Sequence, residues 1–293
     1  MTRLNNPFKG LGVAVVTPFM PDGSVDFESL GGLIDEQLAG GIDFFCVLGT
    51  TAETPTLNTE ERNAITAFFL DRVKGRVPIL LGAGGNDTRK VVEGLKDVPK
   101  GVDGLLIVAP YYNKPSQEGI YQHYKAVAEA TSLPIVVYNV PGRTGVNITA
   151  ETTLRIANDC KNIVATKEAS GNLAQIEKII VNAPEGFEVL SGDDGIAYEL
   201  MLAGAVGAIT VIGNSHALEF GNMIHAIQRG NYVETQKIHH HFNELYTLLF
   251  ADGNPAGVKS VLALQGKIKN ILRLPLVPAS ETTQQKIKVF LNQ

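Results

Sequence analysis

Two residues whose types could perform covalent chemistry each lie at the end of a short apolar run. Lys167 closes the run that begins at Asn162, and Tyr138 ends an earlier run. A lysine amine held at the end of a buried strand tends to lose its proton, because a low dielectric disfavours the charged form. A neutral amine attacks ketones and forms a Schiff base, and a tyrosine on a neighbouring strand can relay the protons of that reaction. The pair therefore predicts Schiff-base chemistry.

A lysine at a strand end more commonly buries its stem and keeps its charged head in solvent, so the prediction depends on the elements that position Lys167. Along the chain, short runs rich in valine, isoleucine and leucine alternate with longer segments of helical period. Near-continuous apolar runs are typical of parallel strands covered on both faces. The predicted strands are Gly12–Thr17, Phe44–Gly49, Pro78–Gly82, Gly104–Ala109, Ile135–Tyr138, Ile163–Lys167, Glu188–Ser191 and Ala208–Ile212.

A helix is predicted after each strand. Asn58-Thr-Glu-Glu61 has the pattern of a capping box, with glutamate three residues after the cap. Eight β-then-α units, without a nucleotide-binding fingerprint, favour an α/β fold of the (β/α)8 TIM barrel type over an open doubly wound sheet. The predicted helices are Asp26–Ala39 and Asn58–Lys74, with others starting near Asp87, Ser116, Thr149, Asn172, Asp194 and Ala217.

The remaining residues have a helical pattern without linker-like composition. Residues 1–230 are therefore predicted to form the barrel, and residues 231–293 a C-terminal helical region packed on it. The helices expected there are Val233–Phe250, Pro255–Leu272 and Thr282–Leu291.

Composition excludes several classes of function. With 25 basic and 30 acidic residues, the net charge of −5 argues against nucleic acid or an anionic membrane as partner. No run of about 18 uncharged apolar residues would span a membrane, and the N-terminal ten residues lack the apolar stretch of a secretion signal. Cys46 lies in an apolar run and fits a core position, while a disulfide with Cys160 is not required. A cytoplasmic protein is expected.

In such barrels the active site lies at the carboxyl ends of the strands, where hydroxyls, small residues, one lysine and one arginine collect. This set suits a small anionic carbonyl substrate, since hydroxyls and amides can bind a carboxylate while lysine attacks the carbonyl. No Cys-x-x-Cys or His-Glu-x-x-His pattern is present, so neither a metal nor a cofactor is expected. His239-His240-His241 cannot converge on one ion, because consecutive helix residues point about 100° apart, and a solvated helix is expected there.

Four motifs in the expected order resemble those of the dihydrodipicolinate synthases, which belong to the N-acetylneuraminate lyase group of class I aldolases. The resemblance covers essentially the whole chain. It implies condensation of pyruvate with L-aspartate 4-semialdehyde to 4-hydroxy-tetrahydrodipicolinate, the first committed step of diaminopimelate and lysine biosynthesis. The motifs are Gly49-Thr-Thr-Ala-Glu53, Tyr111-Tyr-Asn-Lys-Pro-Ser-Gln-Glu-Gly119, Tyr138-Asn-Val-Pro-Gly-Arg-Thr-Gly145 and Ala165-Thr-Lys-Glu-Ala169.

The resemblance also implies individual roles. Lys167 matches the Schiff-base lysine that captures pyruvate, and Tyr138 matches the tyrosine that relays protons. Thr50 matches the threonine bonded to that tyrosine, and Tyr112 the tyrosine that a neighbouring subunit inserts, within a homotetramer built as a dimer of dimers. The remaining matches bind substrate: Thr51 the pyruvate carboxylate, Arg143 the carboxylate of the semialdehyde, and Gly192 and Ile209 the pocket wall.

Two positions depart from the family pattern, and two more differ from its lysine-inhibited members. Ala52 stands where glycine is common, and Gly257 replaces the second proline of Asn-Pro-x-Pro-x-Lys, which is expected to loosen a loop in the helical tail. Arg62 and Lys90 stand where lysine-inhibited relatives carry histidine and glutamate. Because positive charge would repel a ligand with two ammonium groups, inhibition by L-lysine is expected to be weak or absent.

Two alternative functions compete with the synthase. The first is another pyruvate-dependent aldolase of the group, an N-acetylneuraminate or sugar-acid lyase, but those relatives generally lack an arginine at the place of Arg143. The second is a catalytically silent barrel that acts as a binding protein. A scaffold would not need Lys167, Tyr138, Thr50 and Tyr112 together, so the synthase is favoured.

Overall fold

The computed structural model describes residues 2–292. Within that range eight parallel strands are hydrogen-bonded in chain order and close into a barrel, with helices between them, as the sequence predicts. Each predicted strand overlaps an observed one, with small differences at the ends. The strands are β1 (Gly10–Ala14), β2 (Phe44–Val47), β3 (Ile79–Gly82), β4 (Gly104–Val108), β5 (Ile135–Asn139), β6 (Ile163–Glu168), β7 (Glu188–Ser191) and β8 (Gly207–Thr210).

Most helices begin where the sequence places a capping residue. Asn58 accepts a hydrogen bond from the Glu61 amide while the Glu61 side chain accepts one from the Asn58 amide, so the predicted capping box is confirmed. The α-helices are α1 (Phe27–Ala39), α2 (Thr59–Val73), α3 (Thr88–Gly94), α4 (Gln117–Glu129), α5 (Pro141–Thr144), α6 (Ala150–Asp159), α7 (Leu173–Asn182), α8 (Ala197–Ala203), α9 (Ala217–Gln228), α10 (Tyr232–Phe250), α11 (Ala256–Leu264) and α12 (Glu281–Phe290).

Contacts divide the chain into two compact units. Unit 1 comprises the N-terminal segment up to Lys9 together with Pro78–Ile209, and unit 2 comprises Gly10–Val77 together with the chain from Thr210 onward. The helices α10, α11 and α12 thus group with residues 10–77. The predicted division at residue 230 stays a prediction.

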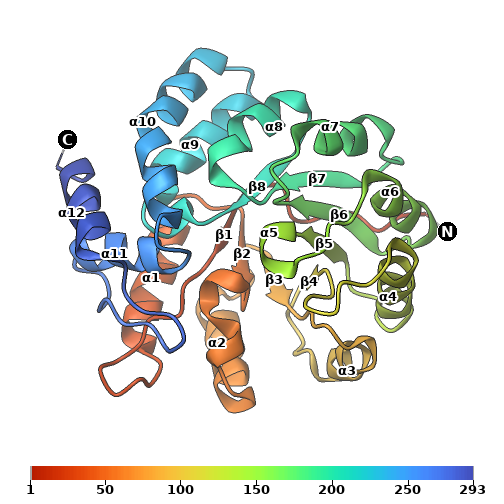
Figure 1. The fold of residues 1–293 in the computed structure, drawn as a ribbon, viewed down its shortest axis with the longest axis horizontal. Coiled ribbons are helices and arrows are strands. Elements are labelled where there is room, and N and C mark those ends of the chain that lie inside the picture. The colour runs from red at the N-terminus through yellow and green to blue at the C-terminus, as the bar shows by residue number, and fades with distance from the viewer. Residues whose placement is uncertain (1, 293) are drawn as a thin grey trace. The chain divides into compact units, whose positions relative to one another are not determined.

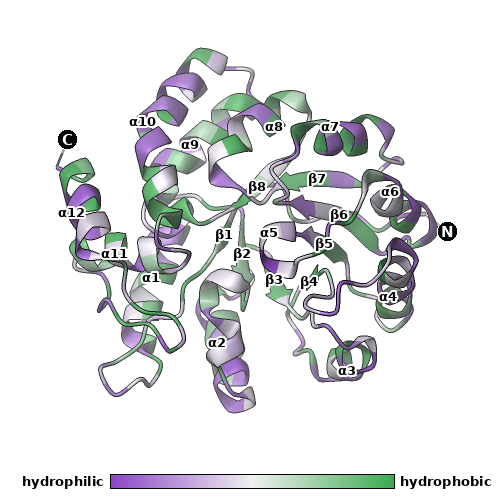
Figure 2. Ribbon diagram, viewed as in Figure 1, coloured by the Kyte–Doolittle hydropathy of each residue, from purple (hydrophilic) through white to green (hydrophobic). Residues whose placement is uncertain are grey.

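Unit 1 is built on the paired strands β3 to β7. Figure 1 shows β5 and β6 beside one another, with α4, α6 and α7 following each other along the outside, and neighbouring helices of this series are in contact. The helix α4 alternates hydrophobic and hydrophilic residues in Figure 2, and its buried side includes Ile120, Tyr124 and Val127. The strands are therefore covered by the apolar stripes of these helices.

Unit 2 contains the paired strands β1 and β2, which are hydrophobic along their length in Figure 2. The helix α9 packs against β1 and α10, and α10 contacts both α11 and α12. The predicted helical tail is confirmed, and within unit 2 it packs against α9 through α10.

One predicted helix of the tail is too long. The segment expected over residues 255–272 is helical only to Leu264, because Gly266 has a φ of +73° and ends the helical path. The expectation for Gly257 is also wrong, since this residue lies in the first turn of α11 and not in a loosened loop. A Cβ at Gly257 would lie 2.3 Å from the Leu249 carbonyl oxygen, so glycine permits a close approach of α11 to the end of α10.

The histidine tract is only partly solvated. His240 and His241 are exposed, as expected, but His239 is buried with its ring 5.6 Å from the ring of Tyr246. The correction follows from the helix period, which turns one of three consecutive side chains inward. In the part of the chain that the structure describes, no three acidic, histidine or cysteine side chains are grouped to hold a metal ion.

Two further predictions concern the membrane and the cysteines. Among the helices of residues 2–292, none has both the length and the apolar character that a membrane crossing requires. Cys46 and Cys160 are both buried and form no disulfide within the described residues, and Cys46 occupies the core position predicted for it.

Candidate active site

Lys167 and Tyr138 lie side by side at the carboxyl ends of two paired strands in unit 1. The register of β5 and β6 pairs Tyr138 with Lys167, and both residues are 6% exposed. The Lys167 Nζ lies 4.4 Å from the centre of the Tyr138 ring. The Lys167 nitrogen therefore lies beside a tyrosine ring in a site that excludes most solvent, an arrangement that would allow Schiff-base formation with proton relay.

Gly192 leaves room for the stem of Lys167. It follows β7, and a Cβ at this position would lie 2.8 Å from Lys167 Cε and 2.9 Å from the Ala169 Cβ. Its amide donates to the Glu168 carbonyl at 2.7 Å, which fixes the glycine beside β6. The structure thus brings Gly192 to Lys167, and the lack of a side chain is what permits the contact.

Arg143 lies in the short helix α5, which begins directly after β5. Pro141 occupies the start of this turn, and Gly145 ends it with a φ of +73°. The Arg143 side chain is exposed, in contrast to Tyr138. An exposed arginine so close along the chain to Tyr138 is suited to recognise a substrate carboxylate from solvent.

A buried polar network lies one residue beyond the Tyr138–Lys167 pair. The register continues with Asn139 opposite Glu168, and neighbouring strand residues point to opposite faces. The Asn139 amide donates to both Glu168 oxygens, at 3.1 and 3.2 Å, and Ser170 donates to the same carboxyl at 2.9 Å. Burial raises the pKa of Glu168 to about 7, against the opposing hydrogen bonds from Ser170 and Asn139.

The same network fixes the segment after α5. Asn139 donates to the Asn147 side-chain oxygen at 2.9 Å and accepts from the Ile148 amide at 3.0 Å. Sequence reasoning assigned no role to Asn139 or Glu168. The carboxyl group of Glu168 at the end of an apolar run could have indicated this network, because a buried charge requires hydrogen-bond partners.

Tyr112 lies in the loop after β4 and is 83% exposed. Its φ of +76° is in the left-handed region, as is that of Lys114 at +49°. A bulky residue in this region is strained, and such strain concentrates at functional sites. Within unit 1, the structure places the Tyr112 side chain in solvent, so the role predicted for it at a partner's active site stays a prediction.

Thr50 and Thr51 form a single 3-10 turn after β2 in unit 2. Thr51 is buried, and its Oγ1 accepts a hydrogen bond from Asn254 at 3.0 Å. The turn is flanked by Leu48 and Glu53, both with a φ of +54°. Two residues in the left-handed region therefore flank this short turn, so its backbone is strained on both sides.

Ile209 is almost fully buried in β8. The register pairs the preceding residue, Ala208, with Ser191 of β7, which directly precedes Gly192. The described contacts place Ile209 at the expected strand but do not bring it to Lys167.

Known proteins match this chain over nearly its full length. The profile described as the dihydrodipicolinate synthetase family matches residues 7–293. The chain belongs to this family. It is 59% identical over 286 residues to the 4-hydroxy-tetrahydrodipicolinate synthase of Phocaeicola vulgatus, covering 97% of this chain and 96% of that one. The synthase of Parabacteroides distasonis matches with the same identity and coverage. A crystal structure of the dihydrodipicolinate synthase from Thermotoga maritima has a TM-score of 0.96 at 44% identity, covering 98% of each chain.

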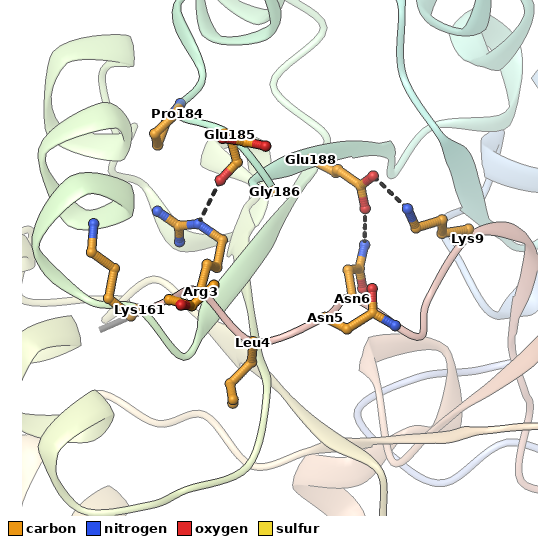
Figure 3. A pocket seen from close by; sticks show the side chains of 11 residues that line it. Arg3, Leu4, Asn5, Asn6, Lys9, Lys161, Pro184, Glu185, Gly186 and Glu188 are labelled. Atoms are coloured by element: carbon orange, nitrogen blue, oxygen red, sulfur yellow. Dashed lines mark hydrogen bonds and ion pairs between the residues drawn. The ribbon is translucent and has the colours of Figure 1, made fainter.

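Unit 1 also contains a polar hollow. A pocket of about 530 Å³ lies near the amino ends of β6 and β7, away from Lys167. In Figure 3, Glu188 lies between Asn6 and Lys9 and bonds to both, while Arg3 donates to the Glu185 carbonyl. Active sites of such barrels lie at the carboxyl ends of the strands. We therefore interpret this hollow, whose polar side chains bind one another, as a structural feature.

Proposed function

We propose that this chain is a lyase that condenses pyruvate with L-aspartate 4-semialdehyde to 4-hydroxy-tetrahydrodipicolinate, through a Schiff base on Lys167. The observation that carries the proposal is the buried contact between Lys167 and Tyr138 at the paired ends of β5 and β6. Relatives that are named as this synthase at 59% identity support the same reaction and its place in lysine biosynthesis.

The chemistry follows from the two side chains. Lys167 Nζ attacks the keto carbon of pyruvate, and one water leaves as the imine forms. Tyr138 supplies and accepts the protons that this exchange needs. Loss of a methyl proton from the imine then gives an enamine, whose carbon attacks the aldehyde of the semialdehyde. Attack of the semialdehyde amino group on the imine carbon closes the ring and releases Lys167 unchanged.

Substrate binding divides among the other residues. We assign Arg143 to the carboxylate of the semialdehyde, since its guanidinium can grip a carboxylate with two hydrogen bonds. Thr51 is assigned to the pyruvate carboxylate and Thr50 to the proton relay, as the family resemblance implies. Gly192 and Ile209 are assigned to the pocket wall. The sugar-acid lyase alternative is disfavoured by the presence of Arg143 and by the names of the relatives.

We further propose that the chain works as a homotetramer, a dimer of dimers, in which each subunit inserts Tyr112 into the adjoining active site. Support comes from the 83% exposure of this aromatic side chain on a strained backbone. A cytoplasmic location is proposed because Cys46 and Cys160 form no disulfide in the described residues. Sedimentation at assay concentration tests the assembly, and a fully active monomer would refute it.

The central experiment traps the imine. Incubation with pyruvate followed by borohydride should reduce the Schiff base and label one lysine, which peptide mass spectrometry should locate at Lys167. Lys167→Ala should remove the label, whereas Lys114→Ala, a control in the loop after β4, should retain it. An equal yield of adduct in Lys167→Ala would disprove the mechanism.

A further inference from the structure

A fully buried ion pair in unit 2 joins the C-terminal helical region to the turn that carries Thr50 and Thr51. Lys259 of α11 binds Glu53, the residue that ends this turn, and both side chains are 0% exposed. Lys259 Nζ also donates to the Ile271 carbonyl at 2.9 Å and lies 4.3 Å from the centre of the Phe19 ring. Burial lowers the pKa of Lys259 to about 8, and Glu53 opposes that shift.

Glu53 is held from a second direction by Arg273. The Arg273 amide donates to the other Glu53 oxygen at 3.0 Å, and the guanidinium lies 4.4 Å from the centre of the Phe19 ring. The same guanidinium donates to the Thr56 carbonyl at 2.8 Å and pairs with Glu61 at the start of α2. The C-terminal region thus binds both ends of the segment from Glu53 to Glu61 through hydrogen bonds and ion pairs.

The ion pair is poorly explained as a stabilising device. Burying two charges costs several kcal/mol each in desolvation, and well-packed apolar replacements are often equally stable. Glu53 itself has a φ of +54°, a conformation that costs of order 1–3 kcal/mol for a residue of this kind. Strain of this type persists only where the surroundings over-determine it, and here two C-terminal segments bind the Glu53 carboxylate.

Hydrogen bonds next to the Glu53–Lys259 pair indicate what the pair holds in place. Asn254, which lies just before α11, donates to the Thr51 hydroxyl at 3.0 Å. Thr17 donates to the Ala52 carbonyl at 2.8 Å, and Thr54 donates to the Gly49 carbonyl at 2.9 Å. The backbone of the turn is therefore fixed on both sides of Thr51, and a change at Glu53 would be transmitted directly to it.

We propose that Glu53 and Lys259 are positioning residues that hold the Thr50–Thr51 turn in the geometry that binds the pyruvate carboxylate. The inference rests on the proposed function for the role of Thr51. It assigns the C-terminal helical region a part in substrate binding, through a pair that touches no substrate. A positioning error on the ångström scale costs an enzyme far more than the contact itself would suggest.

The test replaces both charges at once, so that no unpaired charge stays buried. In Glu53→Gln/Lys259→Met, the pyruvate concentration for half-maximal borohydride trapping should rise at least tenfold. The KM for the semialdehyde should change less than threefold. The matched control is Glu36→Gln/Lys267→Met, which removes a more exposed ion pair between α1 and the same C-terminal region. This control should trap pyruvate like the wild type.

Three further results distinguish the positioning role from a folding defect and from an error in the proposed function. A double variant that melts like the control and saturates with pyruvate like the wild type would overturn the proposal. If the double variant does not fold, Glu53→Asp keeps the charge and tolerates the left-handed backbone, but withdraws the carboxylate by one methylene. This variant should need several-fold more pyruvate, and wild-type saturation would again overturn the proposal. Failure of the wild type to trap pyruvate at all would instead reject the proposed function.

Discussion

The Lys167 nitrogen lies 4.4 Å from the centre of the Tyr138 ring, and the two residues are paired in register on neighbouring strands. The next pair in the same register, Asn139 and Glu168, is hydrogen-bonded on the other face of the strands. One pair of strand ends therefore carries the proposed catalytic pair, Lys167 and Tyr138, on one face and the hydrogen-bonded pair Asn139 and Glu168 on the other. The hydrogen bonds of the second pair hold the backbone that both pairs share.

Tyr138→Phe should slow turnover much more than it weakens the capture of pyruvate. The hydroxyl is needed for proton transfer, which typically contributes 10²–10⁴-fold to the rate, whereas the ring still packs against Lys167. Steady-state kinetics together with the yield of borohydride-trapped adduct would measure both effects. An unchanged turnover number would exclude the relay role.

Gly192→Ala should lower activity by displacing the lysine stem, because the new Cβ would lie 2.8 Å from Lys167 Cε. The expected loss is at least tenfold in the rate of imine trapping, with little change in melting temperature. Gly94→Ala in α3 is a matched control, since nothing lies within 4 Å of its new Cβ. Equal trapping rates in the two variants would contradict the assignment of Gly192.

Glu168→Gln should flatten the pH dependence of stability. Burial raises the pKa of Glu168 from 4.5 to about 7, so the folded state binds its proton more tightly than the unfolded state. The stability that this group contributes is complete below pH 4.5 and is lost as the pH rises through about 7. Over this pH range, the free energy of unfolding of the wild type should thus fall by up to roughly 3 kcal/mol more than that of the variant.

Urea unfolding at a series of pH values measures this difference. Glu177→Gln, an exposed glutamate of α7, provides the control and should follow the wild type. Parallel pH profiles for wild type and Glu168→Gln would show that the buried carboxyl does not titrate in this range.

The fold could be predicted because the strands are buried on both faces, which forces nearly continuous apolar runs such as the one before Lys167. The capping box at Asn58 and the family motifs were equally local signals. Residues whose partners lie far along the chain could not be placed from the sequence. Lys259 in an otherwise apolar helix signalled a buried charge, but Glu53 as its partner depends on the folded chain. Gly257 was misjudged for the same reason, since only the packing of Leu249 explains it.

The same limit applies to regulation, for which the sequence predicts weak or absent inhibition by L-lysine. Arg62 stands where lysine-inhibited relatives carry histidine, and its guanidinium donates to the Thr54 and Leu57 carbonyls, each at 3.0 Å. Lys90, in α3, stands where those relatives carry glutamate. Like charges a few ångströms apart cost about 1 kcal/mol in water and more when partly buried, so two such changes should weaken the binding of a doubly charged amine by orders of magnitude.

Millimolar L-lysine should therefore leave turnover largely unchanged, measured with both substrates and graded lysine. Arg62→His/Lys90→Glu should become measurably more sensitive, because the exchange removes two positive charges and adds one negative charge. Lys96→Glu, at a position for which no lysine-binding role is predicted, controls for the general effect of added negative charge. Half-inhibition of the wild type well below a millimolar would show that the site accepts lysine despite Arg62 and Lys90.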